Sequence, residues 1–464
     1  MTTPSTDKVK LPILAAFGLP ALPVAAIGLV MAVYLPNFFA KHVGISLAAV
    51  GSAFMIVRLI DMGLDPLLGL GMDKTRSGLG RFRPWMLIGS PFVMAAIWFL
   101  FNAQPGMSEV MLIGWLLVLY LGVSILTLGQ AAWAASLATD YHDRSRIYGV
   151  LQAVGVIGAV AILFLPLIIS SRGGSEVDGI RAMSWFLIIM IPVTVAICAI
   201  VTPERIVPDR NKVNASLADY WALVCRPEMI RLLFADFVIA LGPGTVAALY
   251  LFFFHDARGY SIPQTSILLV LFIAAGLLGA VFWAWLARRI GKHRAVMTCT
   301  VAFGISQAAL VAIPAATMSL AMPAMFAVGF VSSAFVMLVR AMVADVADEV
   351  RLETGRDQMG LLYALVTTTE KIGAAMTVGI SFWILSLIGY NPAEGAVNTP
   401  AAIRGLEITY VFAPVILVFV GGACFFGWKL DARRHGEVRA ALDALDAEAA
   451  LLQAGSGINL TRPV

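Results

Sequence analysis

Charged residues are scarce in this sequence. Only 13% of the 464 residues are Asp, Glu, Lys or Arg, and 60% are hydrophobic. Soluble globular domains carry about twice that share of charge. A protein with so few charges cannot expose most of its surface to water, and its basic residues lie in short segments between apolar runs. We therefore expect neither a soluble enzyme nor a nucleic-acid-binding protein.

Cysteine and histidine are also few. The four cysteines show no paired spacing, and none of the five histidines lies deep inside an apolar run. These patterns predict no disulfide framework, no metal site, no cofactor and no histidine proton relay. No nucleophile–base pair lies deep in an apolar run, so we do not expect a membrane-embedded enzyme. A channel is disfavoured because no run repeats a filter motif.

Long apolar runs dominate instead. A run of 18 or more residues is long enough to cross a membrane as a helix. The first run is too long for the core of a signal peptide, so we expect it to be a spanning helix. The sequence therefore predicts an all-α membrane protein with twelve transmembrane helices. The expected spans are 11–40, 46–72, 85–103, 108–138, 147–171, 182–202, 229–255, 263–287, 295–315, 319–344, 359–388 and 406–428.

The basic residues are distributed unequally between the two sides of these spans. If the N-terminus is cytoplasmic, the cytoplasmic ends and loops hold 24 of the 32 Lys and Arg residues. The opposite side holds five: Lys41, Arg172, Arg181, Arg258 and Arg404. This asymmetry follows the positive-inside rule and predicts an inner-membrane protein with both termini in the cytoplasm.

The runs divide into two groups of six. A polar segment at 203–228 separates an N-terminal half, 1–202, from a C-terminal half, 229–428. Two six-helix halves joined by a central cytoplasmic loop are typical of the major facilitator superfamily. In the tail, 429–464, apolar residues recur at helical spacing among charges. This tail is expected to form an amphipathic cytoplasmic helix that docks on the protein or the membrane, the alternative being a partner-binding element.

Three ionisable residues share one face of the second span. Arg58, Asp61 and Asp65 stand at i, i+3 and i+7. Each costs at least about 2.5–3.5 kcal/mol inside a bilayer, so such groups normally face a cavity or one another. One arginine cannot neutralise two carboxylates, and the remaining carboxylate suits Na⁺ or H⁺. The alternative is a structural ion pair that locks two helices together.

Other candidates lie on other spans. Lys371, beside Glu370 in the eleventh span, could reach the Asp61/Asp65 pair, either as a functional group or as a structural salt bridge. Asp236 and Arg340 are candidates for solute binding, although Asp236 could simply lie close to the interface and Arg340 could instead extend to its cytoplasmic side. Trp133 could stack on a sugar or serve as ordinary packing.

Several segments resemble the glycoside–pentoside–hexuronide:cation symporter family of the major facilitator superfamily. They are DMGLDPLLG at 61–69, DKTRSGLGRFRPW at 73–85, DRSR at 143–146, ADVADE at 344–349 and EKIG at 370–373. The resemblance implies the major facilitator fold and solute–cation symport by alternating access. It also implies cation ligands at Asp61 and Asp65, a functional lysine at Lys371 and a sugar-stacking ring at Trp133.

The sequence also departs from that family. Leu64, Leu126 and Gly129 stand where members that use sodium have polar side chains, and 147–171 contains no arginine, leaving Gln152 as the nearest polar group. Because Na⁺ prefers several oxygen ligands, these departures favour H⁺ over Na⁺ as the coupling ion.

We therefore expect a secondary transporter that couples uptake of a sugar or glycoside-like solute to inward cation flow. The alternative is a lipid or lipid-linked glycan translocator on the same fold. The basic loop after the second span is expected to help close one face through carboxylates on neighbouring helix ends. Its residues are Asp73, Arg76, Gly80, Arg81 and Arg83. The oligomeric state is left open.

Overall fold

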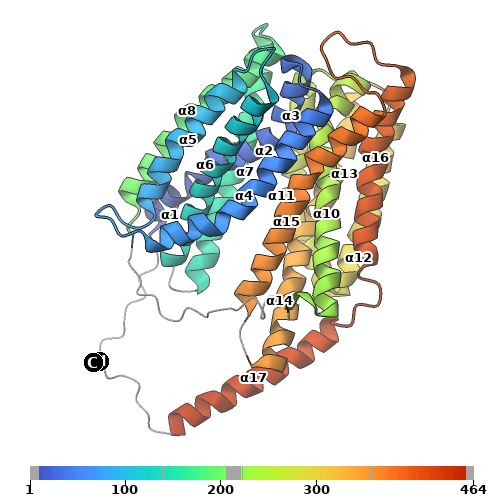
Figure 1. Cartoon of the computed structure of the whole chain (residues 1–464). Helices are drawn as coiled ribbons and strands as arrows, with labels where there is room; N and C mark the ends of the chain where they lie inside the picture. The colour runs from blue at the N-terminus through green and yellow to red at the C-terminus, as the bar shows by residue number, and fades with distance from the viewer. Residues whose placement is uncertain (1–9, 138–140, 205–220, 222, 356–357, 456–464) are drawn as a thin grey trace.

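The computed structural model describes residues 10–137, 141–204, 221, 223–355 and 358–455. These residues form helices joined by turns (Figure 1). In the N-terminal half the helices are α1 (Leu11–Gly18), α2 (Ala21–Val33), α3 (Leu35–Phe38), η1 (Phe39–Val43), α4 (Leu47–Lys74), α5 (Arg83–Phe101), α6 (Glu109–Leu137), α7 (Tyr141–Ser171) and α8 (Glu176–Val201). In the C-terminal half they are α10 (Pro227–Leu251), η2 (Phe252–Ala257), α11 (Ile262–Ile290), α12 (Lys292–Ala309), η3 (Leu310–Ala312), α13 (Met318–Ser332), α14 (Ala334–Thr354), α15 (Met359–Leu387) and α16 (Pro400–Ala423), followed by α17 (Ala432–Gly455).

Twelve spans of the described residues are long and apolar enough to cross a membrane, which confirms the expected fold class. Several ends are shifted, and the sixth and twelfth spans begin at Glu176 and Pro400, six residues before their predicted starts. Two spans differ from the predicted runs in their continuity. The first is broken between Gly18 and Ala21, where Pro20 cannot donate the backbone N–H that a continuous helix needs. The tenth is interrupted at Ser333 and continues to Thr354, ten residues beyond the predicted end. The central segment 203–228 falls largely outside the described residues.

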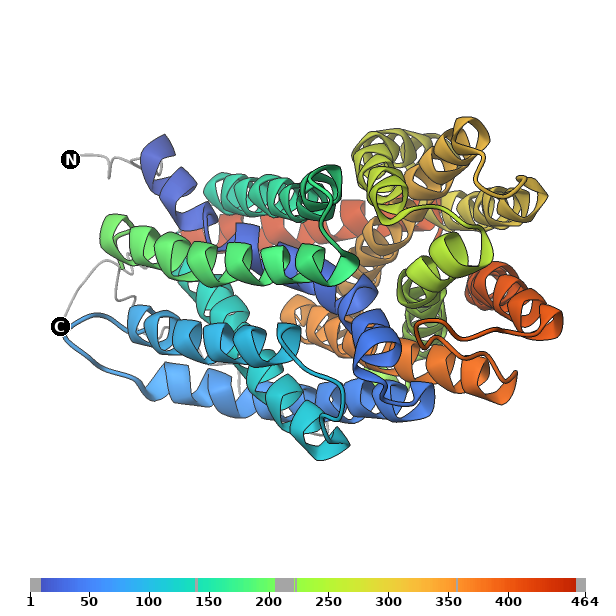
Figure 2. The same cartoon turned by 90° about the horizontal axis from the view of Figure 1, so that it is seen from above.

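Six spans lie on each side of that segment, and they form two bundles side by side (Figures 1 and 2). The bundles meet where α4 packs along α15, α7 along α11 and α2 along α10. Within the C-terminal bundle, α11 and α13 are in close contact at Gly329. A Cβ atom on Gly329 would lie 2.2 Å from the Phe272 carbonyl oxygen, so only glycine allows this crossing.

Polar side chains cap the first turn of several helices. The Ser46 hydroxyl accepts a hydrogen bond from the Ala49 backbone N–H at the start of α4. Ser175 and Asp178 form a reciprocal capping box at the start of α8. Such caps satisfy backbone N–H groups that have no partner within the helix. They fix where α4 and α8 begin and therefore which side chains reach the middle of the bundle.

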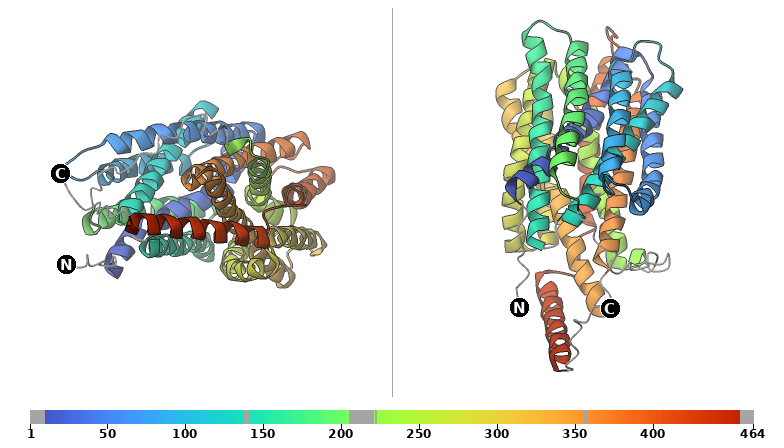
Figure 3. Two further views of the ribbon diagram at one scale, coloured as in Figure 1. Left: turned by 90° about the horizontal axis from the view of Figure 1, so that it is seen from below. Right: turned by 90° about the vertical axis from the view of Figure 1, so that its left-hand side faces the viewer.

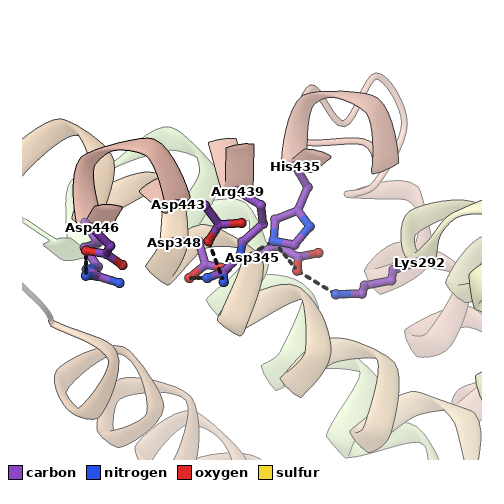
Figure 4. A network of polar contacts seen from close by, with 8 residues as sticks. Lys292, Asp345, Asp348, His435, Arg439, Asp443 and Asp446 are labelled. Atoms are coloured by element: carbon purple, nitrogen blue, oxygen red, sulfur yellow. Dashed lines mark hydrogen bonds and ion pairs between the residues drawn. The ribbon is translucent and has the colours of Figure 1, made fainter. Parts of the chain in front are cut away.

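The C-terminal helix α17 packs on the C-terminal end of α14. Val438 and Leu442 are buried, whereas Leu445 is exposed. Around this apolar contact the His435 ring lies 3.1 Å from the Asp348 carboxylate, and Arg351 donates to Asp446 at 2.7 Å (Figure 4). Seen from below, α17 crosses beneath the two bundles (Figure 3). The structure thus shows the tail helix docked on the protein itself.

Candidate solute and cation site

The charged face of α4 points into the protein. Asp61 is fully buried. One of its carboxylate oxygens accepts a hydrogen bond from the Ser124 hydroxyl of α6 at 2.7 Å, and the other accepts from the Arg58 guanidinium at 3.3 Å. The Arg58 guanidinium also lies 5.0 Å from the centre of the Tyr120 ring. Asp61 is therefore held by one hydroxyl and one cation within the N-terminal half.

Asp65 has a different partner, one turn further along α4. The ammonium group of Lys371 on α15 donates to one oxygen of its carboxylate. The other oxygen is buried and has no hydrogen-bond partner. In the structure Lys371 thus reaches Asp65, and its functional role stays a prediction. Because α4 and α15 belong to different halves, this ion pair connects them at the centre of the protein.

A second group of charges lies where α15 faces α14 within the C-terminal half. The Arg340 guanidinium of α14 donates to both oxygens of Glu370, at 3.2 and 2.8 Å. Glu370 and Lys371 are neighbours in sequence, yet they pair with groups on opposite sides, since adjacent helical residues point about 100° apart. Asp236 of α10 is near this pair, only 4% exposed, and its Oδ2 atom has no hydrogen-bond partner. Arg340 therefore pairs within the bundle in this structure, instead of extending to the interface.

A cavity of about 350 Å³ lies between the two halves. Its lining is mostly apolar and comes from α2, α4, α6, α10 and α15. Arg58, Tyr120 and Thr377 supply polar side chains. Small-molecule sites are typically about 300–1,000 Å³ and combine apolar walls with few polar groups. Of Arg58, Asp61 and Asp65, only Arg58 lines this cavity, while Asp61 and Asp65 face Ser124 and Lys371.

Two other predicted solute contacts lie elsewhere. The Trp133 ring is fully buried, and its edge packs against Phe17 at a centroid distance of 5.7 Å. Its Nε1 atom donates to the Pro203 carbonyl oxygen at 3.3 Å, and the Arg83 guanidinium lies 5.6 Å from the ring centre. Gln152 is exposed on α7. Neither residue lines the cavity, so Trp133 serves as packing in this conformation, and its stacking on a sugar stays a prediction.

The basic loop after α4 folds around a carboxylate. One oxygen of Glu204, just beyond the end of α8, accepts hydrogen bonds from the backbone N–H groups of Arg81 and Phe82, at 2.5 and 2.9 Å. Gly80 has φ +113°, and a Cβ atom there would lie 2.1 Å from Glu204. The backbone conformation at this position therefore favours glycine, and a larger residue would also displace the Glu204 carboxylate.

Two arginines complete this loop. Arg83 donates to the Thr202 carbonyl oxygen at 2.5 Å, and Arg76 donates to the carbonyl oxygen of Thr75 at 3.0 Å. The Asp73 side chain lies outside the described residues. The loop thus meets a carboxylate at a neighbouring helix end, as expected, although its role in closing one face stays a prediction.

The two halves are also linked at the opposite end. Lys41 lies 2.9 Å from Glu176 in its own half and 4.0 Å from Asp256 in the other. The Tyr34 hydroxyl lies 3.2 Å from the Ser266 hydroxyl across the halves, and Trp383 of α15 donates to the Ser52 hydroxyl of α4 at 3.0 Å. These contacts close this end of the interface in the conformation described.

Three polar site residues were not predicted from the sequence: Ser124, Tyr120 and Thr377. Ser124 and Tyr120 are one turn apart on α6 and both meet the α4 cluster, Ser124 at Asp61 and Tyr120 at Arg58. Their i, i+4 spacing within an apolar run is a signal that could have found them. Thr377 shows the same i, i+4 spacing with Ser381 on α15.

Comparisons with known proteins agree with this arrangement. Residues 16–432 match the family described as MFS/sugar transport protein. The isoprimeverose transporter of Lactiplantibacillus pentosus is 27% identical over 86% of this chain and 84% of that protein. The glucuronide carrier protein homolog of Escherichia coli K12 is 24% identical over 89% of this chain and 91% of that protein.

Solved structures show the same fold. The nucleoside transporter NupG superposes with a TM-score of 0.67 at 14% identity, covering 90% of this chain and 100% of that one. A bacterial homolog of the human lysosomal transporter Spinster, inward-facing and unoccupied, superposes with a TM-score of 0.65 at 14% identity, covering 91% of this chain and 97% of that one. With a family match that spans both six-helix halves, the chain belongs to the MFS/sugar transport protein family and is a transporter, not an enzyme.

Proposed function

We propose that this transporter couples uptake of a sugar or glycoside-like solute to inward flow of H⁺ at Asp61 and Asp65. The observation that carries the proposal is the ion pair between Asp65 on α4 and Lys371 on α15. This pair joins the two halves beside a cavity of about 350 Å³. Sugar carriers among the relatives support the solute class and do not favour the alternative of a lipid translocator.

Protonation of Asp65 provides a simple route from ion binding to movement. The Asp65–Lys371 pair holds α4 against α15 only while the carboxylate is ionised. A proton on Asp65 removes the negative charge and weakens the link between the halves. A cation can shift a conformational equilibrium only by its differential affinity for the two states, and this link supplies such a difference. The two halves then rock about the central site and carry proton and solute together.

The contacts of the carboxylates support H⁺ over Na⁺. The Ser124 hydroxyl places one neutral oxygen beside the Asp61 carboxylate. Beside Asp65, the Lys371 ammonium group occupies the position where a bound Na⁺ would lie. The Thr127 hydroxyl is turned back to the carbonyl oxygens of Val123 and Ser124, at 2.9 and 3.2 Å. A hard cation such as Na⁺ prefers several oxygen ligands, whereas a proton needs only one.

Uptake into proteoliposomes tests this function. The parent protein would be assayed with a panel of sugars and glycosides that includes isoprimeverose, raffinose, lactose and a glucuronide, under imposed H⁺ or Na⁺ gradients. We expect one or more solutes to accumulate when an H⁺ gradient is imposed. In Asp61→Asn and Asp65→Asn variants, accumulation should be lost while solute exchange is retained. Full accumulation in both variants removes these residues from the mechanism, and accumulation that requires Na⁺ at fixed pH overturns the proton assignment.

Orientation in the inner membrane is also a proposal. The distribution of basic residues supports termini on the cytoplasmic side, at the end where α17 lies. Single cysteines at Leu79 and Val397, both exposed, report on the two ends. In intact cells an impermeant maleimide should label position 397 and spare position 79. The reverse pattern contradicts this orientation.

A further inference from the structure

One carboxylate at the centre of the protein has no cation of its own. We call the ionisable residues at this point of the interface the central charge cluster; they are Arg58, Asp61, Asp65, Asp236, Arg340, Glu370 and Lys371. The cluster holds three cations and four carboxylates. Each cation has a carboxylate partner: Arg58 with Asp61, Lys371 with Asp65 and Arg340 with Glu370. Asp236 is the carboxylate that remains.

Among the described residues of the bundle, the surroundings of Asp236 offer no other cation. Its electrostatic neighbours are Glu370 on α15 and Arg340 on α14. The Arg340 guanidinium already donates to both oxygens of Glu370. Lys371, next along α15, pairs with Asp65 on the opposite side. Glu370 therefore adds a negative charge on the same side as Asp236, while the nearby positive charge is already paired.

The other elements packed against α10 do not change this balance. Helices α2 and α3 carry no Asp, Glu, Lys, Arg or His. On α16 the charged residues are Arg404 and Glu407, both near its first turns, and Glu407 pairs with Arg258 at 3.1 Å. On α10 itself Arg231 donates to the backbone carbonyl oxygens of Cys424 and Phe426. The histidine and aspartate of η2 lie at the far end of the span from Asp236.

A buried carboxylate with no partner is costly when ionised, and a proton removes that cost. We propose that Asp236 is a second proton-binding site, separate from Asp61 and Asp65, and that it is occupied in the conformation described. With this proton the cluster carries three positive and three negative charges. Asp236 is 4% exposed and its Oδ2 atom is buried without a partner, so the proton resides in a site with little access to bulk water.

The same charge balance couples Asp236 to the N-terminal carboxylates. When Asp61 or Asp65 is neutralised by a proton, the cluster no longer has an excess carboxylate, and an ionised Asp236 restores neutrality. The Asp236 proton then passes to water, and the electron pair of the O–H bond stays on the carboxylate. Binding at one site therefore disfavours binding at the other, and this effect is reciprocal. The protonation itself does not require solute transport, whereas its use in the transport cycle rests on the proposed function.

Infrared difference spectroscopy on the full-length protein in liposomes tests the proton site. Near neutral pH the parent protein should show a carboxylic acid C=O band that is absent in Asp236→Asn. The band should persist at a shifted frequency in Asp236→Glu, which keeps an ionisable group. Glu448→Gln, an exposed change on α17, should leave the band unchanged. If the spectrum of Asp236→Asn retains the full band, Asp236 is not protonated and the proposal is overturned. If Asp236→Asn does not fold, Asp236→Glu decides instead, and a band that stays at the parent frequency overturns the proposal.

A second comparison tests the coupling. The Asp236 band is measured in Asp65→Asn and Asp61→Asn, each with and without Asp236→Asn. Because each variant removes one carboxylate from the cluster, the Asp236 band should lose most of its amplitude at the same pH. An unchanged band overturns the coupling. None of these measurements needs a transported solute, so a failure of the uptake assays and a failure of the Asp236 site are distinguishable.

Discussion

Lys41 provides a direct test of how the closed end of the interface is held. Its side chain is 10% exposed, and its ammonium group lies between Glu176 and Asp256. The pair with Glu176 stays within one half and survives when the halves separate. The contact with Asp256 crosses between the halves, so its loss changes the balance between closed and open states. We expect Lys41→Met to favour opening at this end.

The magnitude follows from the distance. At an effective dielectric constant of about 20, two unit charges about 4 Å apart attract by about 4 kcal/mol. The Lys41–Asp256 separation is 4.0 Å. Rehydration of both groups on opening offsets part of this attraction, and we take about 2 kcal/mol as the remaining difference. That change shifts the equilibrium about thirtyfold. An open state with a population of about 1% would rise to about a quarter.

Electron–electron distance measurements can detect such a shift. Spin labels at Gln104 and Val397, which are exposed in loops of the two halves, would be introduced into a cysteine-free background. Lys41→Met should add a longer distance that is minor in the parent, while Lys41→Arg should resemble the parent because it keeps the charge. As a control, Arg181→Gln removes a half-exposed cation that pairs within α8. Equal distributions in Lys41→Met and the parent, or an equal change in the control, would refute this account.

Three further outcomes follow from packing, burial and capping. Gly329→Ala should lower the thermal midpoint by several degrees because a methyl group collides with a backbone carbonyl. Gly114→Ala, with open space around it, should leave the midpoint unchanged, and melting curves in detergent compare the two variants. Val438→Asp should release α17 to limited proteolysis by costing about 2–3 kcal/mol of buried contact, whereas Leu445→Asp at an exposed site should not. The pKa of Asp431 is lowered because its carboxylate accepts a backbone hydrogen bond at the start of α17. This stabilisation is present above the ordinary pKa and is lost as pH falls through the lowered value. Hydrogen exchange in the first turn of α17 should therefore accelerate only in acid. In Asp431→Ala the same amides should exchange fast at every pH.

The pattern of apolar runs determined the fold class. Membrane helices satisfy their backbone groups within one segment, so length and hydropathy alone predict a span. For this reason twelve spans could be predicted before any contact was known. The break at Pro20 was less clear, because a helix in a membrane can tolerate proline where neighbouring helices satisfy the freed groups. The extension of α14 to Thr354 was not predicted, and α17 packs against this charged end in the structure.

The candidate site could be predicted from the ionisable residues that lie inside the spans. Arg58, Asp61 and Asp65 were recognisable because their cost in a bilayer is high and their spacing places them on one helix face. Only the tertiary structure decided their partners. Asp61 meets Ser124 from α6, and Asp65 meets Lys371 from α15. Sequence spacing defines neighbours along one helix, but it carries no measure of which helices lie side by side.

The structure also separated residues that the sequence grouped together. Trp133 and Gln152 were candidates for solute contact, yet neither lines the cavity, whereas Tyr120 and Thr377 do. A tryptophan in an apolar run has the same sequence signal whether its ring packs inside a bundle or faces a cavity. The sequence by itself therefore determined the spans and the charges they contain, since both follow from local cost in a membrane. The pairing of those charges, and the carboxylate at Asp236 that remains, depend on the packing of distant helices, which only the tertiary structure decides.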